Sequence, residues 1–260
     1  MSAAENVDLD TSIQRQFGAA ATNYVSSPVH SGGPTLEGLV ARAALTGRER
    51  VLDVGTGAGH TALALAPRAA EVIALDLTEE MLSAAAGLAR ERGLSNVWFR
   101  RGRAEALPFA DGAFDLVTSR LCAHHYADPA AATREAARVL RPGGQYLLVD
   151  AYSPEDPVQD TYLNAIEVLR DPSHVRNYRI SEWQAMFEAA GFALEVGPRW
   201  AVRLEFASWV ERIGTPAPLV AGLRALIDAA PSEVRETLQI ARETGHDWSI
   251  PIALFVAKRR

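Results

Sequence analysis

Val51-Leu52-Asp53-Val54-Gly55-Thr56-Gly57-Ala58-Gly59-His60 is the stretch that decides the fold. Its first four residues are typical of a buried strand, the next five carry glycine at every second position, and a helix is predicted over 60–69. Glycine adopts positive φ and lets a ligand approach the bare backbone. The helix that begins there presents free N–H groups and a partial positive charge. Such a turn lies at the carboxyl end of a parallel strand, where open α/β sheets bind ligands.

Strand and helix signals alternate along the rest of the chain, which is typical of a mostly parallel α/β sheet. Ser181 is expected to cap a helix, and Pro142-Gly143-Gly144 to form a turn. Residues 1–12 are expected to be loosely attached, and 206–247 to form an insertion of short helices. Strands are expected at 50–54, 72–76, 96–100, 114–118, 146–150, 192–204 and 250–257, and helices at 13–24, 35–44, 60–69, 79–92, 129–140, 159–169 and 182–190.

The composition is that of an ordinary globular protein, and it argues against several classes of function. The chain has 260 residues, of which 48% are hydrophobic and 22% charged, and its formal net charge is −6. This acidic balance argues against nucleic acid as the main partner. No apolar stretch approaches the roughly 18 residues of a membrane span, and the polar start shows no signal peptide. The single cysteine, Cys122, rules out internal disulfides and suits a reducing cytoplasm.

Two acidic residues at predicted strand ends indicate the kind of ligand. Asp53 lies two residues before the first glycine of the turn, where a carboxylate would disfavour a pyrophosphate and favour an ammonium group. This favours S-adenosylmethionine over a dinucleotide, and the Gly-x-Gly-x-Gly spacing also departs from that of dinucleotide sites. Asp76 ends the next strand and is expected to accept hydrogen bonds from ribose hydroxyls, a feature that both ligand classes share.

The glycine turn resembles motif I of the class I methyltransferases, and a second segment strengthens that resemblance. Residues 102–109, Gly-Arg-Ala-Glu-Ala-Leu-Pro-Phe, are followed by Phe114-Asp115. Their order and spacing are similar to a segment of the methyltransferases of ubiquinone and menaquinone biosynthesis. Residues 150–157, 171–176 and 182–183 resemble a subset of uncharacterised bacterial methyltransferases close to that group, and this likeness covers residues 14–200 and, weakly, the remainder. It implies a Rossmann-like seven-stranded, mostly parallel sheet with an antiparallel last strand.

The same resemblance implies how the chain is divided. Residues 1–45 would form an N-terminal helical lid over the cofactor, and residues 46–152 the cofactor-binding core. Residues 153–260 would form the remainder of the core, with helical insertions at about 153–180 and 206–247 as the cap over the substrate. Long connections at one end of a sheet are where such specificity elements belong.

Arg103 departs from the family pattern, which usually has aspartate at this position to bind the adenine amino group. Arginine has only donors and cannot accept a hydrogen bond from an amine. The adenine would then be held by the backbone N–H of Ala104, by stacking on the guanidinium or by Glu105, or else Arg103 would point outward. The residues that the resemblance and the strand ends assign to S-adenosylmethionine are Asp53, Gly55, Thr56, Gly57, Gly59, Asp76, Leu77, Met81, Arg103, Ala104, Glu105 and Ser119.

His124 and His125 follow the fourth strand, where the transferred methyl group should emerge, and similar family members carry Ala-His-His-Phe there. Histidine titrates near neutrality and can take a proton from a nucleophile. His125 is the best candidate for a catalytic base, with His124 and Tyr126 behind it. Alternatively, one histidine ties the loop to the backbone. Cys122 is expected to be a small buried residue rather than a nucleophile.

The segment after the fifth strand is the expected acceptor side of the site. The resemblance places it over the active-site mouth, so His174 and Arg176 are candidates for holding an anionic or phenolic substrate. The alternative is a loop that these polar groups tie down. Tyr24 and Trp183 are candidates for an apolar wall, unless they are core residues. No metal site is expected.

These observations predict an enzyme that transfers a methyl group from S-adenosylmethionine to an O, C or N atom of a small molecule by direct displacement. Three alternatives stay open: a different reaction with the same cofactor, a non-catalytic cofactor-binding accessory protein, and an NAD-dependent dehydrogenase, against which the glycine spacing argues. The protein is expected in the cytoplasm without a nucleic-acid partner, and it could form a homodimer.

Replacing Asp76 by alanine should weaken cofactor binding, because the ribose hydroxyls would lose their acceptor. Each lost hydrogen bond that involves a charged group is worth about 1–3 kcal/mol. Calorimetric titration of the variant and the parent with S-adenosylmethionine measures the loss. Unchanged affinity would remove Asp76 from the site.

Overall fold

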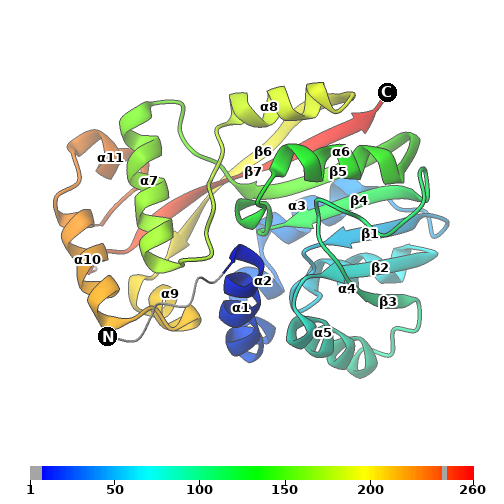
Figure 1. The fold of residues 1–260 in the computed structure, drawn as a ribbon, viewed down its shortest axis with the longest axis horizontal. Coiled ribbons are helices and arrows are strands. Elements are labelled where there is room, and N and C mark those ends of the chain that lie inside the picture. The colour runs from blue at the N-terminus through cyan, green and yellow to red at the C-terminus, as the bar shows by residue number, and fades with distance from the viewer. Residues whose placement is uncertain (1–7, 242–244) are drawn as a thin grey trace.

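The computed structural model describes residues 8–241 and 245–260, and this part of the chain contains one seven-stranded sheet (Figure 1). The strands are β1 (Arg50–Val54), β2 (Glu71–Asp76), β3 (Val97–Arg101), β4 (Phe114–Arg120), β5 (Leu140–Ala151), β6 (Phe192–Leu204) and β7 (Trp248–Arg259). Their order is β3-β2-β1-β4-β5-β7-β6. β7 pairs antiparallel with both β5 and β6, while the other pairs are parallel. The predicted mostly parallel sheet with an antiparallel last strand is confirmed.

Apolar residues alternate between the two faces of the sheet, as the two-residue period of a strand requires. Val51 and Leu147 belong to the core on one face, and their neighbours Leu52 and Leu148 belong to the core on the other. All of Val51–Val54 is buried. A parallel strand covered on both faces therefore accounts for the nearly continuous apolar run in this stretch of sequence.

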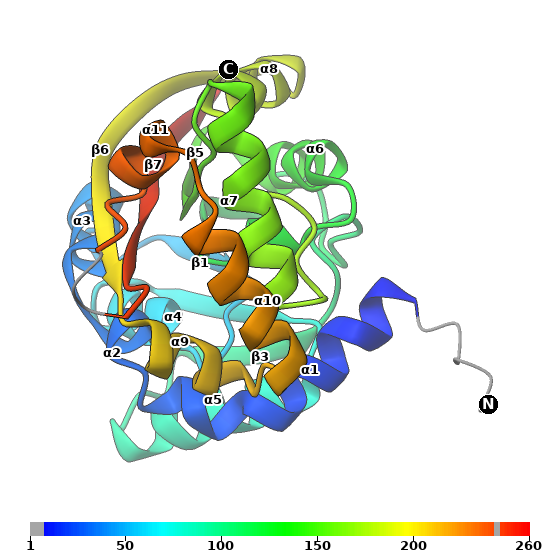
Figure 2. The ribbon, with the colours of Figure 1, turned by 90° about the vertical axis from the view of Figure 1, so that its left-hand side faces the viewer.

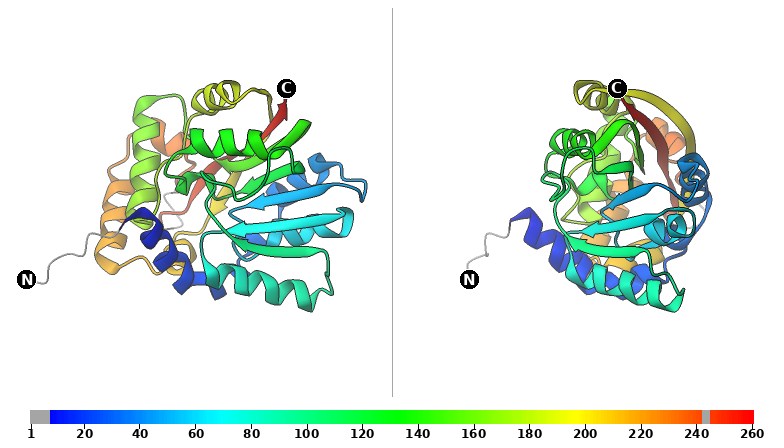
Figure 3. Two further views of the ribbon diagram at one scale, coloured as in Figure 1. Left: turned by 45° about the vertical axis from the view of Figure 1, so that its right-hand side comes forward. Right: turned by 90° about the vertical axis from the view of Figure 1, so that its right-hand side faces the viewer.

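Helices cover both faces of this sheet. The helices are α1 (Leu9–Val25), α2 (Pro28–Ser31), α3 (Pro34–Ala43), α4 (His60–Leu65), α5 (Glu79–Glu91), α6 (Pro129–Val139), α7 (Pro157–Arg170), α8 (Ile180–Ala189), α9 (Phe206–Ile213), α10 (Ala217–Asp228) and α11 (Ser232–Thr237), with 3₁₀ turns η1 (Ala66–Arg68) and η2 (Ala123–His125). α3, α4 and α5 bury side chains in the core that contains Val51, and α6 and α8 in the core that contains Leu52. Figure 3 shows α5 beside the edge strand β3. None of the described helices is long and apolar enough to cross a bilayer.

A group of helices lies beyond the carboxyl ends of the parallel strands. The arrowheads of β1 and β2 point toward the side of the molecule where α7, α9 and α10 lie (Figure 1). α10 and α11 pack against α7, while α1 crosses the same end against α5 and α9 (Figure 2). The insertion predicted at 206–247 forms α9, α10 and α11, and its residues 242–244 lie outside the described residues. The strand ends are thus covered by segments from both halves of the chain.

The N-terminal region differs from the prediction. α1 begins at Leu9, so residues 9–12, which were expected to be loosely attached, are helical; residues 1–7 lie outside the described residues. A cap explains the longer helix, because the Asp8 carboxylate accepts a hydrogen bond from the Thr11 backbone N–H at 2.8 Å. α2 forms between two predicted helices, where none was expected.

One local prediction in the second half of the chain is wrong, and another is met inside a strand. Ser181 lies inside α8, and its hydroxyl donates to the Glu155 carboxylate at 2.7 Å instead of capping the helix. The cap position belongs to Arg179, whose backbone N–H donates to the Glu182 carboxylate at 2.8 Å. The turn predicted at 142–144 interrupts β5, which begins at Leu140: Gly143 has a φ of +76°, and the register with β4 passes from Phe114–Leu140 to Leu116–Gln145, so residues 141–144 bulge out of the pairing. At Ser181 a hydrogen bond to a residue of another segment overrides the local signal.

Replacing Trp183 by alanine should destabilise the fold by roughly 3–5 kcal/mol, because it opens a cavity in the core. The Trp183 side chain is 2% exposed, and its ring centre lies 5.6 Å from that of Tyr178 and 5.9 Å from those of Phe187 and Phe255. Urea unfolding measures the change. Trp183→Phe is the matched control and should cost less, since it keeps most of the ring volume. A Trp183→Ala variant with parental stability would contradict the assignment to the core.

Candidate active site

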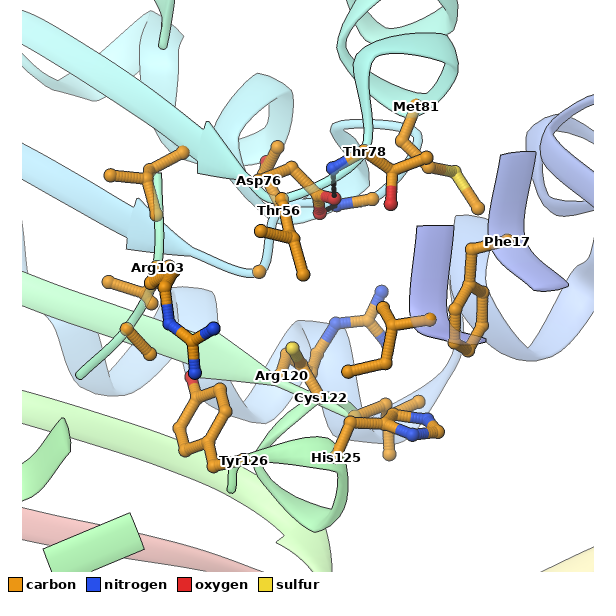
Figure 4. Close-up of a pocket in the computed structure, with 18 of the residues that line it drawn as sticks. Phe17, Thr56, Asp76, Thr78, Met81, Arg103, Arg120, Cys122, His125 and Tyr126 are labelled. Atoms are coloured by element: carbon orange, nitrogen blue, oxygen red, sulfur yellow. Dashed lines mark hydrogen bonds between the residues drawn. The ribbon is translucent and has the colours of Figure 1, made fainter. Parts of the chain in front are cut away.

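A pocket lies at the carboxyl ends of β1, β2 and β4, and α1 covers it (Figure 4). We refer to it as the strand-end pocket; together with its open mouth it holds about 980 Å³ of empty space. The strand ends supply the glycine turn, Asp76 and residues 120–122, and the loop after β3 supplies residues 102–105. Phe17 of α1 closes one end, opposite Arg103 and Tyr126. The pocket therefore lies at the edge of the sheet where the sequence predicts a ligand site.

The glycine turn contributes a bare backbone to the pocket wall. Gly55 has a φ of +67°, and a Cβ there would meet Sγ of Cys122 at 2.0 Å, so no larger residue fits. Gly57 also has positive φ (+53°), but a Cβ there would meet no atom within 4 Å, and the residue lines the pocket. Gly59 does not line it; a Cβ there would meet that of Ala85 at 2.8 Å. The turn thus leaves room for a ligand beside Gly57 and packs tightly elsewhere.

Asp53 lies behind this turn and does not line the pocket. The residue is 1% exposed, and its carboxylate accepts hydrogen bonds from the hydroxyls of Thr56 at 2.7 Å and Thr118 at 2.6 Å. Burial raises the pKa of Asp53 to about 6, although the two hydroxyls and Arg120 act in the opposite direction. Asp53 therefore ties the turn after β1 to β4.

Asp76 holds the same turn from the end of β2. One carboxylate oxygen accepts from the Gly57 backbone N–H at 2.8 Å, and the other accepts from the Thr78 backbone N–H at 2.9 Å. Burial raises the pKa of Asp76, and these bonds oppose the rise. Each carboxylate oxygen can accept more than one hydrogen bond, so Asp76 can also accept from a ligand hydroxyl in the pocket that it lines.

The loop after β3 forms the end of the pocket opposite Phe17. The predicted residues Arg103, Ala104 and Glu105 line this end, whereas the predicted Leu77 and Met81 line the pocket from the end of β2 and from α5, with Met81 on the side of Phe17. The Arg103 guanidinium forms ion pairs with Asp10 of α1 and, at 3.5 Å, with Glu105. One Glu105 oxygen accepts from the Ala127 backbone N–H at 2.9 Å. Arg103 thus joins the wall of the pocket to the helix that covers it.

The rings of His124 and His125 lie side by side in η2, with their centres 4.3 Å apart. Nδ1 of His125 donates to the carbonyl oxygen of Ser173 at 3.0 Å, which leaves a lone pair on Nε2. Burial and the neighbouring His124 lower the pKa of His125 to about 4. Nδ1 of His124 donates to Asp150 at 2.7 Å; burial disfavours the charged ring, but Asp150 outweighs burial and raises the pKa of His124. The ring of His124 therefore favours the protonated form, and the ring of His125 favours the neutral form.

Arg120 is a site residue that sequence reasoning missed. It ends β4, lines the strand-end pocket and is 8% exposed. Its Nε donates to the Thr61 hydroxyl at 3.0 Å, and its guanidinium donates to the carbonyl oxygen of His30. Burial lowers the pKa of Arg120 to about 10, and Asp53 opposes this shift. A charged residue directly after an apolar strand is the signal that could have revealed it.

A second cavity adjoins the first, and we refer to it as the α7 cavity. The two share Phe17, Tyr24, His30, Leu121 and His125. His124 lines only the α7 cavity, together with residues of α7, α9 and the ends of β6 and β7. The predicted His125 and Tyr24 therefore lie where the two cavities meet, and the predicted His124 lies on the side of the α7 cavity.

Six predicted site residues line neither cavity: Asp53, Gly59, Ser119, His174, Arg176 and Trp183. Arg176 forms an ion pair with Asp160 of α7 at 2.8 Å. Burial lowers the pKa of His174 to about 2, so its ring is neutral. Ser119 shares a hydrogen bond of 2.9 Å with the hydroxyl of Tyr126, which itself lines the strand-end pocket. The polar groups expected at the acceptor side thus fasten the loop before α8 to α7.

The wall of the strand-end pocket fits S-adenosylmethionine. The open space beside Gly57, which any side chain would fill, leaves backbone exposed to a ligand. Asp76 offers an acceptor for ribose hydroxyls, and Arg120 offers a cation for a carboxylate. Leu77 and Met81 offer an apolar surface for a base. These groups match the sugar, amino acid and adenine parts of that cofactor.

Comparison with known proteins indicates the same chemistry. The methyltransferase domain family model matches residues 52–148. The uncharacterised methyltransferase YcgJ of Bacillus subtilis is 44% identical over 224 residues, which cover 86% of this chain and 88% of YcgJ. The demethylmenaquinone methyltransferase of Thermus thermophilus is 44% identical over 108 residues, which cover 41% of this chain and 49% of that protein.

Comparison with solved structures shows that the similarity includes the fold. The crystal structure of YcgJ superposes with a TM-score of 0.85 at 42% identity and covers 87% of this chain and 98% of that chain. A putative methyltransferase from Bacillus halodurans, BH2331, superposes with a TM-score of 0.84 at 38% identity and covers 87% of this chain and 99% of that chain. Each of these similar proteins is named as a methyltransferase.

Replacing Asp53 by asparagine should shift the stability difference between variant and parent in favour of the variant as the pH rises. The pKa of Asp53 is about 6 in the folded state against 3.8 ordinarily, so its contribution to stability is complete below pH 3.8 and is lost as the pH rises through 6. A shift of this size corresponds to roughly 3 kcal/mol at most. Urea unfolding of variant and parent at about pH 4.5 and about pH 7.5 tests this. The advantage of the variant should grow with pH, and a difference independent of pH would refute the shift.

Proposed function

The chain belongs to the class I S-adenosylmethionine-dependent methyltransferases, and from this premise we propose that it methylates an O, C or N atom of a small molecule. The observation that carries the proposal is that two cavities meet at His125. One has the chemistry of a cofactor site, and the other offers space for an acceptor. A reacting atom at the junction would lie beside a residue that can hold a proton.

The shape and lining of the α7 cavity and the net charge both support a small acceptor. The α7 cavity is a cleft between α1, α7 and α9 that is lined mainly by apolar side chains, and such clefts suit small molecules. The net charge of −6 disfavours nucleic acid as the acceptor. We therefore propose a small molecule, and the same acidic balance and single cysteine are consistent with the expected cytoplasmic location.

We assign the cofactor to the strand-end pocket, with Asp76 on its ribose, Arg120 on its carboxylate, and Leu77 and Met81 on its adenine. When bound, S-adenosylmethionine supplies an electrophilic methyl group, which a nucleophile takes by direct displacement. Asp53 acts through the backbone, because it holds the glycine turn in the conformation that leaves room beside Gly57. Alignment of the acceptor atom with the methyl group and the sulfur of the cofactor then contributes much of the rate enhancement.

His125 is the proposed general base. Its low pKa of about 4 keeps the ring neutral at physiological pH, and Nε2 carries the free lone pair because Nδ1 donates to Ser173. A proton released by an O or N nucleophile can pass to Nε2. His124, paired with Asp150, lies behind it with a ring-centre distance of 4.3 Å. An acceptor that is methylated on a carbon atom and has no acidic proton would need no base. It would need only to be aligned with the methyl group.

The N-terminal helices are the proposed lid. Phe17 of α1 packs edge to face on His125 with a ring-centre distance of 4.9 Å. The Gln16 side chain donates to the carbonyl oxygen of Ile213 at 2.6 Å, and Asp10 pairs with Arg103. α1 therefore contacts both the cofactor wall and the cap helices, which supports a role in closing the site over both ligands.

The test combines binding and turnover. We expect calorimetry to detect binding of S-adenosylhomocysteine and not of NAD, and methyl-labelled S-adenosylmethionine to label one member of a panel of phenols, hydroxy acids and amines. His125→Asn keeps a donor toward Ser173 but removes the base, so it should lower kcat by about 10²–10⁴-fold for an O–H acceptor. Affinity for S-adenosylhomocysteine should stay unchanged.

His246→Asn is the matched control, because His246 lines neither cavity and should leave turnover unchanged. A product that carries no labelled methyl group would favour a different reaction with the same cofactor. Tight cofactor binding without any product would favour an accessory protein. Parental turnover of His125→Asn would remove His125 from the mechanism.

A further inference from the structure

We propose that the acceptor is a compact, largely apolar molecule with one carboxylate or comparable oxyanion and one neutral hydrogen-bond donor, of which an aromatic hydroxy acid is the simplest example. Arg170 binds the oxyanion in the α7 cavity, and Glu167 accepts a hydrogen bond from the donor. This inference rests on the proposed function and names the substrate class for it.

Glu167 and Arg170 lie one turn apart on α7 and line the α7 cavity. The two residues are only 6% and 8% exposed. Glutamate and arginine are almost never buried to this extent unless they are paired. Their burial therefore needs an explanation from their surroundings.

The surroundings leave one atom of each side chain without a partner. Within the described part of the chain, Oε1 of Glu167 and Nη2 of Arg170 are buried and form no hydrogen bond. The rest of the Arg170 guanidinium is held in place, because its Nε donates to the carbonyl oxygen of Trp209 at 3.2 Å and its carbon lies 5.1 Å from the centre of the Trp209 ring. A guanidinium that is fixed in place and has a free N–H group at Nη2 is preorganised to bind an oxyanion.

The charged residues that line the α7 cavity also favour the binding of an anion. Arg212 of α9 lines the same cavity, and burial together with Arg170 lowers the pKa of Arg212. Neither Arg170 nor Arg212 has a carboxylate within ion-pair distance among residues 8–241 and 245–260. Asp171, which follows α7, does not line the cavity, and its carboxylate accepts from the backbone N–H and the hydroxyl of Ser173 at 2.9 and 2.6 Å. Among the described residues that line the α7 cavity, two arginines thus stand beside a single carboxylate, that of Glu167.

The other side chains that line the α7 cavity indicate the polarity of the rest of the acceptor. It consists of side chains such as Leu204, Ile250 and Ile252, which favour an apolar body. The cavity opens to the strand-end pocket at Phe17 and His125. A molecule anchored at Arg170 can therefore extend across an apolar surface toward the proposed base.

The experiment compares matched probes by calorimetry with S-adenosylhomocysteine at saturation. The probes are para-hydroxybenzoate, a hydroxynaphthoate and the methyl ester of each. We expect at least one acid to bind roughly 10- to 100-fold more tightly than its ester, the range of a hydrogen bond to a charged group. Arg170→Met should abolish that preference. Arg68→Met, at an exposed position outside both cavities, is the matched control and should keep it.

Two further variants test the preference for acids over esters if Arg170→Met does not fold. Arg170→Lys keeps the charge without the planar edge and should lose most of the preference, and Arg212→Gln should reduce it. Equal binding of acids and esters by the parent, or an intact preference in the Arg170 variants, would overturn this inference. Failure of the parent to bind S-adenosylhomocysteine would instead count against the proposed function.

Discussion

The carboxylate of Asp53 is the constraint on which the site depends. It joins the hydroxyl of Thr56, in the turn after β1, to that of Thr118 on the neighbouring strand β4. Because Asp53 is buried, water cannot replace either bond, and the turn keeps the positive φ values that bare its backbone. Asp76 holds the same turn from β2. Two acidic residues that face inward thus determine where a ligand can approach the three central strands.

Positive charge gathers where the two cavities meet, although the protein as a whole is acidic. His30 lines both cavities, and burial together with the guanidiniums of Arg120, Arg170 and Arg212 holds the pKa of its ring well below the usual value. These three arginines come from β4, α7 and α9. A site built in this way favours ligands that bring their own negative charge, such as the carboxylate of an amino acid or of a hydroxy acid.

The sequence predicts the parts of the site that depend on neighbours along the chain. The glycine turn and Asp76 belong to single strand–turn–helix units, so periodicity and composition are enough to locate them. Arg176 and Trp183 were expected at the acceptor side, but the first is paired with Asp160 and the second packs in the core. Glu167 was not predicted as a site residue, because no local pattern in the sequence indicates that a charged residue on a helix faces inward. Such burial depends on how α7 packs against distant segments.

The place of β7 in the sheet has a consequence for how the chain is made. β7 lies between β5 and β6, and it joins residues as far apart as Gln145 and Lys258. During synthesis β6 has no strand to pair with until residues 248–259 have left the ribosome. The unpaired backbone of β6 must be kept from other chains for that time, since open strand edges promote aggregation. The sheet is therefore complete only after β7 has been synthesised and has paired with both neighbours.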